Sequence, residues 1–103
     1  MIRYIEESRE FSLETKTTQY CMCIRPDGHL EHLYYGVRTS GDLWETLRDR
    51  SLFETGNAIV TGDAVCLESL TQEMSGCGRG DVGDPFVRVV HSDGSSTCDF
   101  LYE

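Results

Sequence analysis

The side chains best suited to bind a metal ion lie in the first third of the chain. His29 and His32 have an HxxH spacing, and Cys21 and Cys23 are separated by one residue. On a helix the two histidines could chelate an ion, but on a strand residues three apart point to opposite faces and need a bulge to share one. We therefore expect histidines of a core or an interface, and no metal site.

The two cysteines are spaced more tightly than the usual structural zinc pair. No second Cys or His pair follows at zinc-finger spacing. We interpret Cys21 and Cys23 as small buried hydrophobic residues. A small metal or thiol protein that uses this pair remains an alternative.

The glycine-rich stretch 76–83 resembles a phosphate-binding loop only superficially. It lacks the Gly-Lys-Ser/Thr sequence that gives a P-loop its charge and its metal ligand. Residues 79–81 spell the tripeptide RGD, which is short enough to occur by chance. We interpret the stretch as a structural loop.

Trp44 is the only tryptophan, and it lies close in sequence to Arg48, Asp49 and Arg50. Sugar sites are often built this way, because C–H faces stack on the ring and hydroxyls bond charged groups. A buried tryptophan beside a solvated charge cluster is the alternative interpretation. The chain has 18 carboxylates, and nothing in the sequence identifies a catalytic pair among them.

The elements that position these residues are short β-strands. Residues 11–15 alternate apolar and polar groups, and 18–25 and 29–36 are rich in β-forming residues around the turn 26–28 (PDG). These three segments predict an antiparallel meander. Strict alternation puts two sets of side chains on the faces of the third strand: Leu30, His32 and Tyr34 against His29, Leu33 and Tyr35.

The rest of the chain adds one short helix and further strands. We predict a helix over 43–48, a loop over 49–62, a strand over 64–70, a loop over 75–85, and a hairpin of 86–91 and 97–102 around the turn 92–95. This pattern predicts one all-β domain over 1–103, an antiparallel β-sandwich. The chain stops within the last predicted strand, so we expect it to be part of something longer.

Composition excludes several classes of function. The chain has 103 residues and a net charge of −9, which disfavours nucleic acid and anionic membranes as partners. No apolar run is long enough for a transmembrane helix, and the N-terminus lacks a signal-peptide core. Five cysteines without a signal peptide indicate reduced thiols and a cytoplasmic location.

Four motifs occur in an order that closely resembles the N-terminal domain of glycoside hydrolase family 36 α-galactosidases. They are 28–36 (GHLEHLYYG), 70–73 (LTQE), Gly80-Asp81 with Pro85, and 93–95 (DGS) followed by Asp99-Phe100 and Tyr102. Singly these motifs are weak. Together, from about Phe11 to Tyr102, they are specific.

The resemblance implies that the chain is the N-terminal portion of a larger β-supersandwich (galactose-mutarotase-like). A catalytic (β/α)8 barrel and a C-terminal β-domain would follow. Such enzymes remove terminal α-linked galactose from oligosaccharides of the raffinose and melibiose type. They retain configuration through two aspartates of the barrel and need no cofactor or metal. The catalytic residues would therefore lie outside this chain, and a homo-oligomer, often a tetramer, is expected.

The resemblance carries over few site residues. Asp49 resembles a loop aspartate that approaches the sugar pocket of a neighbouring subunit, and we keep Asp49 and Trp44 as substrate-binding candidates. The chain departs from the family at three places. The family usually has a basic residue shortly before the segment that begins at Leu70, and the nearest match here is Asp63. Cys77 stands where the family prefers a tyrosine, and the loop after Asp81 lacks the family's aromatic residue and arginine.

Two hypotheses therefore compete. The first is a non-catalytic N-terminal part of an α-galactosidase, which packs on the barrel, supports oligomerisation and edges the substrate pocket. The second is a free-standing sugar-binding or protein-interaction β-sandwich, with Trp44 and Tyr34 or Tyr35 as the aromatic platform.

Overall fold

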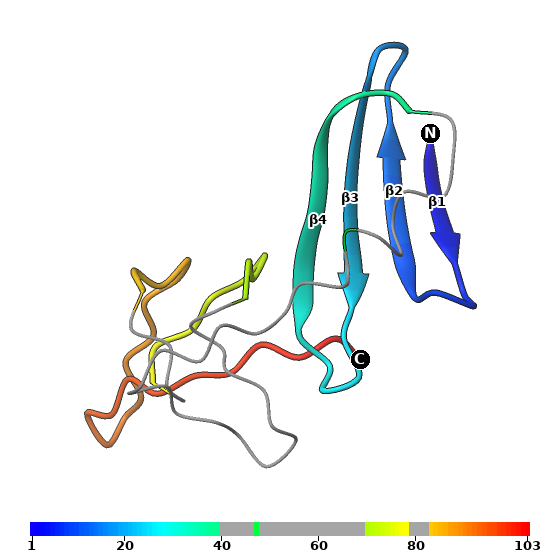
Figure 1. Cartoon of the computed structure of the whole chain (residues 1–103). Helices are drawn as coiled ribbons and strands as arrows, with labels where there is room; N and C mark the ends of the chain where they lie inside the picture. The colour runs from blue at the N-terminus through cyan, green and yellow to red at the C-terminus, as the bar shows by residue number, and fades with distance from the viewer. Residues whose placement is uncertain (40–46, 48–69, 79–82) are drawn as a thin grey trace.

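A computed structural model describes residues 1–39, 47, 70–78 and 83–103. The described part is built on one antiparallel sheet of four strands in the order β1-β2-β3-β4 (Figure 1). The strands are β1 (Ile2–Ile5), β2 (Glu10–Glu14), β3 (Thr18–Ile24) and β4 (Leu30–Val37). This confirms the all-β class and the meander that the sequence predicts.

The turn between β3 and β4 has the chemistry expected of residues 26–28. Gly28 N donates to Arg25 O at 2.9 Å, and Arg25 N donates to His29 O at 2.9 Å. Gly28 has a φ of 91°, in the left-handed region that glycine reaches without strain. Tyr102 N donates to Gly28 O at 2.9 Å, so the C-terminal run (residues 96–103) ends against this turn (Figure 1).

The first strand was not predicted. Ile2–Ile5 pairs with β2, with Tyr4 opposite Phe11. Every residue of β1 is exposed, so the strand contributes one edge of the sheet rather than a core element. Four residues of mixed character give too short a pattern for alternation to identify.

A β-bulge corrects the predicted faces of β4. Cys21 is opposite Tyr34, whereas Met22 is opposite His32, so the register shifts between these two pairs. The extra residue is Leu33, and beyond it the side chains change face. Tyr35 therefore joins His32 on the face of Tyr20, and Tyr34 packs with Cys21 on the other face. Strict alternation separated His32 from Tyr35, and that prediction was wrong.

One face of the sheet is buried, and we call it the buried face. Its apolar cluster is Cys21, Cys23 and Leu33, with Tyr34 and Leu47 packed against it. The two cysteines are each 2% exposed, which confirms their interpretation as small buried residues. The same face also holds buried polar residues of β2 and β3: Glu10, Ser12, Glu14 and Gln19.

The other face, which we call the open face, carries large apolar side chains that remain exposed. Ile2 and Tyr4 of β1 are 74% and 47% exposed. Tyr35 and Val37 of β4 are 68% and 74% exposed. The register places all four on one side of the sheet, together with Phe11 and Tyr20.

The predicted hairpin of 86–91 and 97–102 is not formed, because its return strand pairs elsewhere. The turn itself exists: Gly94 N donates to His91 O at 2.9 Å, and Gly94 has a φ of 85°. Cys98 N, however, donates to Cys77 O, and Tyr102 N donates to Gly28 O. Neither segment is a strand in the structure.

The remaining predictions fall largely outside the described residues. Of the predicted helix 43–48 only Leu47 is described, and it is helical. The predicted strand 64–70 is described only at Leu70. The described residues of the loop 75–85 contain no helix or strand, as predicted. Within the described part of the chain, no helix has the length and apolar character needed to cross a membrane.

Candidate functional site

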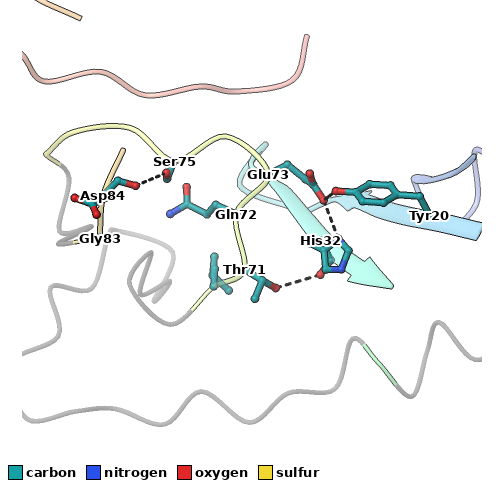
Figure 2. A pocket seen from close by; sticks show the side chains of 9 residues that line it. Tyr20, His32, Thr71, Gln72, Glu73, Ser75, Gly83 and Asp84 are labelled. Atoms are coloured by element: carbon teal, nitrogen blue, oxygen red, sulfur yellow. Dashed lines mark hydrogen bonds and ion pairs between the residues drawn. The ribbon is translucent and has the colours of Figure 1, made fainter. Parts of the chain in front are cut away.

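A cleft of about 510 Å³ lies beside the outer edge of β4 (Figure 2). Tyr20 and His32 form one side of it, from the open face of the sheet. The remaining lining comes from 70–75 and from Gly83 and Asp84. The cleft therefore joins three parts of the chain that are far apart in sequence.

The segment after Leu70 reaches the cleft because it pairs with the edge of β4. His32 N donates to Thr71 O at 2.7 Å, and Glu73 N donates to Leu30 O at 2.9 Å. Glu31 and Gln72 form an antiparallel bridge between these bonds. The pairing covers part of an edge that would otherwise expose unpaired backbone groups, and it fixes residue 73 beside the sheet.

Glu73 is the centre of the polar network in the cleft. Tyr20 donates its hydroxyl proton to Glu73 Oε1, and His32 Nδ1 lies 3.1 Å from the same oxygen. Figure 2 shows both rings directed toward this carboxylate. The rings of Tyr20 and His32 also pack against each other, with centroids 5.1 Å apart.

Burial and the neighbouring carboxylate keep Tyr20 protonated. Desolvation, and then the hydrogen bond to Glu73 and its charge, raise the pKa of Tyr20 to about 12. Tyr20 is therefore a neutral hydrogen-bond donor at physiological pH and not a general base. The cleft offers aromatic surface, a carboxylate and an imidazole, which is the chemistry of a binding site.

The two histidines of the HxxH spacing contact different carboxylates. His29 is buried, with Nδ1 3.2 Å from Asp27 Oδ2 and Nε2 2.7 Å from Asp99 Oδ1. His32 contacts Glu73 in the cleft. His29 therefore ties the C-terminal run to the turn between β3 and β4, and it is an interface residue as expected.

The two substrate-binding candidates from the sequence, Trp44 and Asp49, lie outside the described residues. The cleft residues were missed for two reasons. No local pattern places Glu73 beside a hairpin that lies forty residues earlier. Alternation places Tyr20 and His32 on one face whether or not the bulge is present, but the sequence does not show that this face, rather than the face of the two cysteines, lines a cleft. The turn 26–28 and the aromatic content of both strands were the only signals available.

The chain is similar to known glycoside hydrolases over its whole length. The family model of the glycosyl hydrolase family 36 N-terminal domain matches residues 28–103. The bifunctional α-galactosidase/sucrose kinase AgaSK of Mediterraneibacter gnavus is 32% identical over 106 residues, which cover 99% of this chain. The chain spans only 11% of that relative's length.

Two solved structures have the same fold. The galactosidase domain of AgaSK superposes with a TM-score of 0.82 at 30% identity, over 100% of this chain and 15% of the solved chain. The family 36 α-galactosidase AgaB of Geobacillus stearothermophilus gives a TM-score of 0.78 at 24% identity, over 100% and 14% of the respective chains. At 24% identity, the similarity to AgaB is evidence for the fold alone.

Proposed function

Because this chain belongs to the glycosyl hydrolase family 36 N-terminal domain family, we propose that it is the non-catalytic N-terminal part of an α-galactosidase. The enzyme would release terminal α-linked galactose from raffinose- and melibiose-type oligosaccharides with retention. The observation that carries this proposal is the similarity to the galactosidase domain of AgaSK, which extends over the whole chain. The two carboxylates of a retaining mechanism would lie in a part of the enzyme beyond these residues.

The open face supports a packing role for the chain. Tyr35 and Val37 are 68% and 74% exposed, and Ile2 and Tyr4 lie on the same side of the sheet. Exposed apolar surface of this kind marks a region that another surface covers. The rest of the enzyme, including its catalytic barrel, is the proposed partner, and a second subunit would add the oligomer contacts.

Trp44 and Asp49 are the proposed contributors to the edge of a sugar pocket. An indole ring stacks on the C–H face of a sugar, and a carboxylate accepts hydrogen bonds from its hydroxyls. Loss of either side chain should raise KM for raffinose and leave kcat nearly unchanged, because neither group would take part in bond cleavage. Steady-state kinetics of Trp44→Phe and Asp49→Asn in the full-length enzyme measure this, and a loss confined to kcat would remove both residues from the proposal.

The cellular location proposed is the cytoplasm. An odd number of cysteines, five, is more typical of reduced thiols than of a disulfide framework, and this supports the proposal.

The proposed activity is tested on the full-length protein that carries this chain. We expect hydrolysis of melibiose and raffinose, with α-galactose as the first product seen by proton NMR before mutarotation. β-Galactose as the first product would contradict retention. Absence of galactoside hydrolysis by a folded full-length protein would refute the proposed function.

The alternative is a free-standing sugar-binding module, and the cleft at Glu73 is the observation that favours it. Its aromatic and carboxylate groups could bind a sugar without any barrel. Titration of this chain with millimolar melibiose, followed by the NMR signals of His32, distinguishes the two. Saturable shifts at His32 that Glu73→Gln abolishes would favour the module, and unchanged signals would exclude it.

A further inference from the structure

Two cysteines meet where the segment after Leu70 contacts the C-terminal run. Cys98 N donates to Cys77 O at 3.0 Å, and Cys77 N donates to Cys98 Sγ at 3.4 Å. The thiol of Cys77 lies 3.9 Å from Ser96 Oγ, on the run that carries Cys98. Each thiol is therefore directed toward the segment that holds the other.

The backbone geometry fits a disulfide between these residues. A hydrogen bond from the amide of one residue to the carbonyl of the other keeps their Cα atoms within about 7 Å. Disulfide-bonded cysteines have Cα atoms about 4.4–6.8 Å apart. The two ranges overlap, so the separation of the two backbones is compatible with a disulfide.

Gly76 permits this close approach. A Cβ at Gly76 would lie 2.5 Å from Cys98 O and 3.2 Å from Cys98 Sγ. At the first distance the Cβ would clash with the backbone carbonyl of Cys98, which cannot rotate away as a side chain could. The absence of a side chain at residue 76 therefore sets how near Cys98 comes to Cys77.

Cys77 and Cys98 are more accessible to solvent than the cysteines of the sheet. Cys77 and Cys98 are half-buried, whereas Cys21 and Cys23 are each 2% exposed. Burial also raises the pKa of the Cys21 thiol, which lowers its content of reactive thiolate. An oxidant in solution reaches the half-buried pair first.

We propose that Cys77 and Cys98 form a reversible thiol–disulfide modification site whose oxidant is a low-molecular-weight disulfide such as oxidised glutathione. One cysteine thiolate attacks the glutathione disulfide, releases one glutathione and becomes a mixed disulfide. The second thiolate attacks the protein sulfur and expels the other glutathione. The two cysteines lose two protons and two electrons, and oxidised glutathione gains them and becomes two thiols.

The bond would lock together two segments that are each anchored to the sheet. The segment after Leu70 pairs with β4 through Thr71 and Glu73. The C-terminal run is held by Asp99 at His29 and by Tyr102 at Gly28. Oxidation would therefore restrict the segment that presents Glu73 to the cleft.

The test oxidises the native protein that carries this chain with oxidised glutathione, alkylates the remaining thiols and maps the products by mass spectrometry. Trypsin with a glutamate-specific protease releases Cys77 in residues 74–79, Cys98 in residues 89–103 and Cys66 in a separate peptide. The expected product is the 74–79 peptide joined to the 89–103 peptide with loss of two hydrogen atoms. Dithiothreitol should restore both thiols.

The single variants Cys77→Ser and Cys98→Ser are the matched controls. Each should abolish the joined peptide and leave the other cysteine as a glutathione adduct. Oxidation should also slow amide exchange of residues 70–78 in the parent protein and have no such effect in Cys98→Ser. Cys77 and Cys98 recovered only as separate adducts, or a joined peptide no more abundant than after oxidation in guanidinium, would overturn the proposal.

Discussion

The carboxylate of Glu14 shows how a charge is kept on the buried face of the sheet. Arg3 donates to Glu14 Oε1, and Arg38 Nη2 lies 3.0 Å from Glu14 Oε2. Ser12 also donates to Oε1, at 3.2 Å. The hydrogen bond from Arg3 is the main reason that the pKa of Glu14 is lowered, and it outweighs the opposing effect of burial.

Glu14→Gln should destabilise the chain at neutral pH and lose its effect in acid. A lowered pKa means that the ionised carboxylate stabilises the fold above its ordinary pKa, near 4.5, and that this contribution is lost as pH falls through the lowered value. Urea unfolding at a series of pH values measures this. Glu7→Gln, at an exposed position, is the control. If Glu14→Gln lowered the free energy of unfolding equally at neutral and acid pH, the charge of Glu14 would not be the cause.

Tyr20→Phe should lower the free energy of unfolding by roughly 1–3 kcal/mol, because a hydrogen bond to a charged group is lost. The parent protein should also weaken in alkali. Its tyrosine pKa of about 12 means that the stabilisation is complete below pH 10 and is lost as pH rises toward 12. Titration of absorbance at 295 nm, compared with Tyr20→Phe, isolates this group. A phenol that titrates near pH 10 would show that the bond to Glu73 is not formed.

The element that organises the site is the hairpin of β3 and β4, with its turn and its bulge. The turn fixes the register at Ile24 and Leu30, and the bulge then shifts it between Cys21 and Met22. Because of this shift, Tyr35 joins Tyr20 and His32 on one face. The segment of Thr71–Glu73 pairs with the outer edge of β4 in this hairpin.

Gly28→Ala tests the turn that sets this register. A φ of 91° costs an alanine about 1–2 kcal/mol, and its Cβ would meet only ordinary contacts with Leu101, at 3.5 Å. We expect the variant to unfold at lower urea concentration. Gly28→Asn should lose less stability than Gly28→Ala, because asparagine enters the left-handed region more readily. Equal losses for both variants would mean that backbone conformation is not the cause.

Sequence reasoning predicted the parts of the fold that local chemistry determines. The turn 26–28, the strand around Phe11 and Leu13, and the burial of Cys21 and Cys23 follow from residue type and spacing. The burial within that strand does not, because its polar residues are more buried than Phe11 and Leu13. The pairing of the C-terminal run with Gly28 depends on contacts between distant residues, whereas the bulge at Leu33 and the short strand β1 leave no clear pattern in the sequence. The Glu73 site was also out of reach, because it is built by long-range contacts of residues 71–73 with β4 and of Glu73 with Tyr20.

For the whole molecule, the open face is the surface on which the two proposed functions differ. Four large apolar side chains lie on one side of a sheet of four strands. A free-standing domain would leave this surface in water. A domain packed on a barrel would cover it.

Val37→Ser should therefore have opposite effects in two settings. It should reduce self-association of this chain expressed alone, because an exposed apolar group is removed. It should lower the thermal stability of the full-length enzyme, where the open face is proposed to be buried. Val90→Ser is the matched control, since Val90 is 70% exposed but lies outside the sheet. Unchanged thermal stability of the full-length Val37→Ser enzyme would contradict the proposal that the open face is buried there.

The most direct measurement is to capture the native protein with an antibody against these residues, then size it and assay it for α-galactosidase. We predict a polypeptide far larger than 11.7 kDa that hydrolyses melibiose. A captured protein of 11.7 kDa without this activity would contradict it, and hydrolysis would have to be given up as the function of the protein.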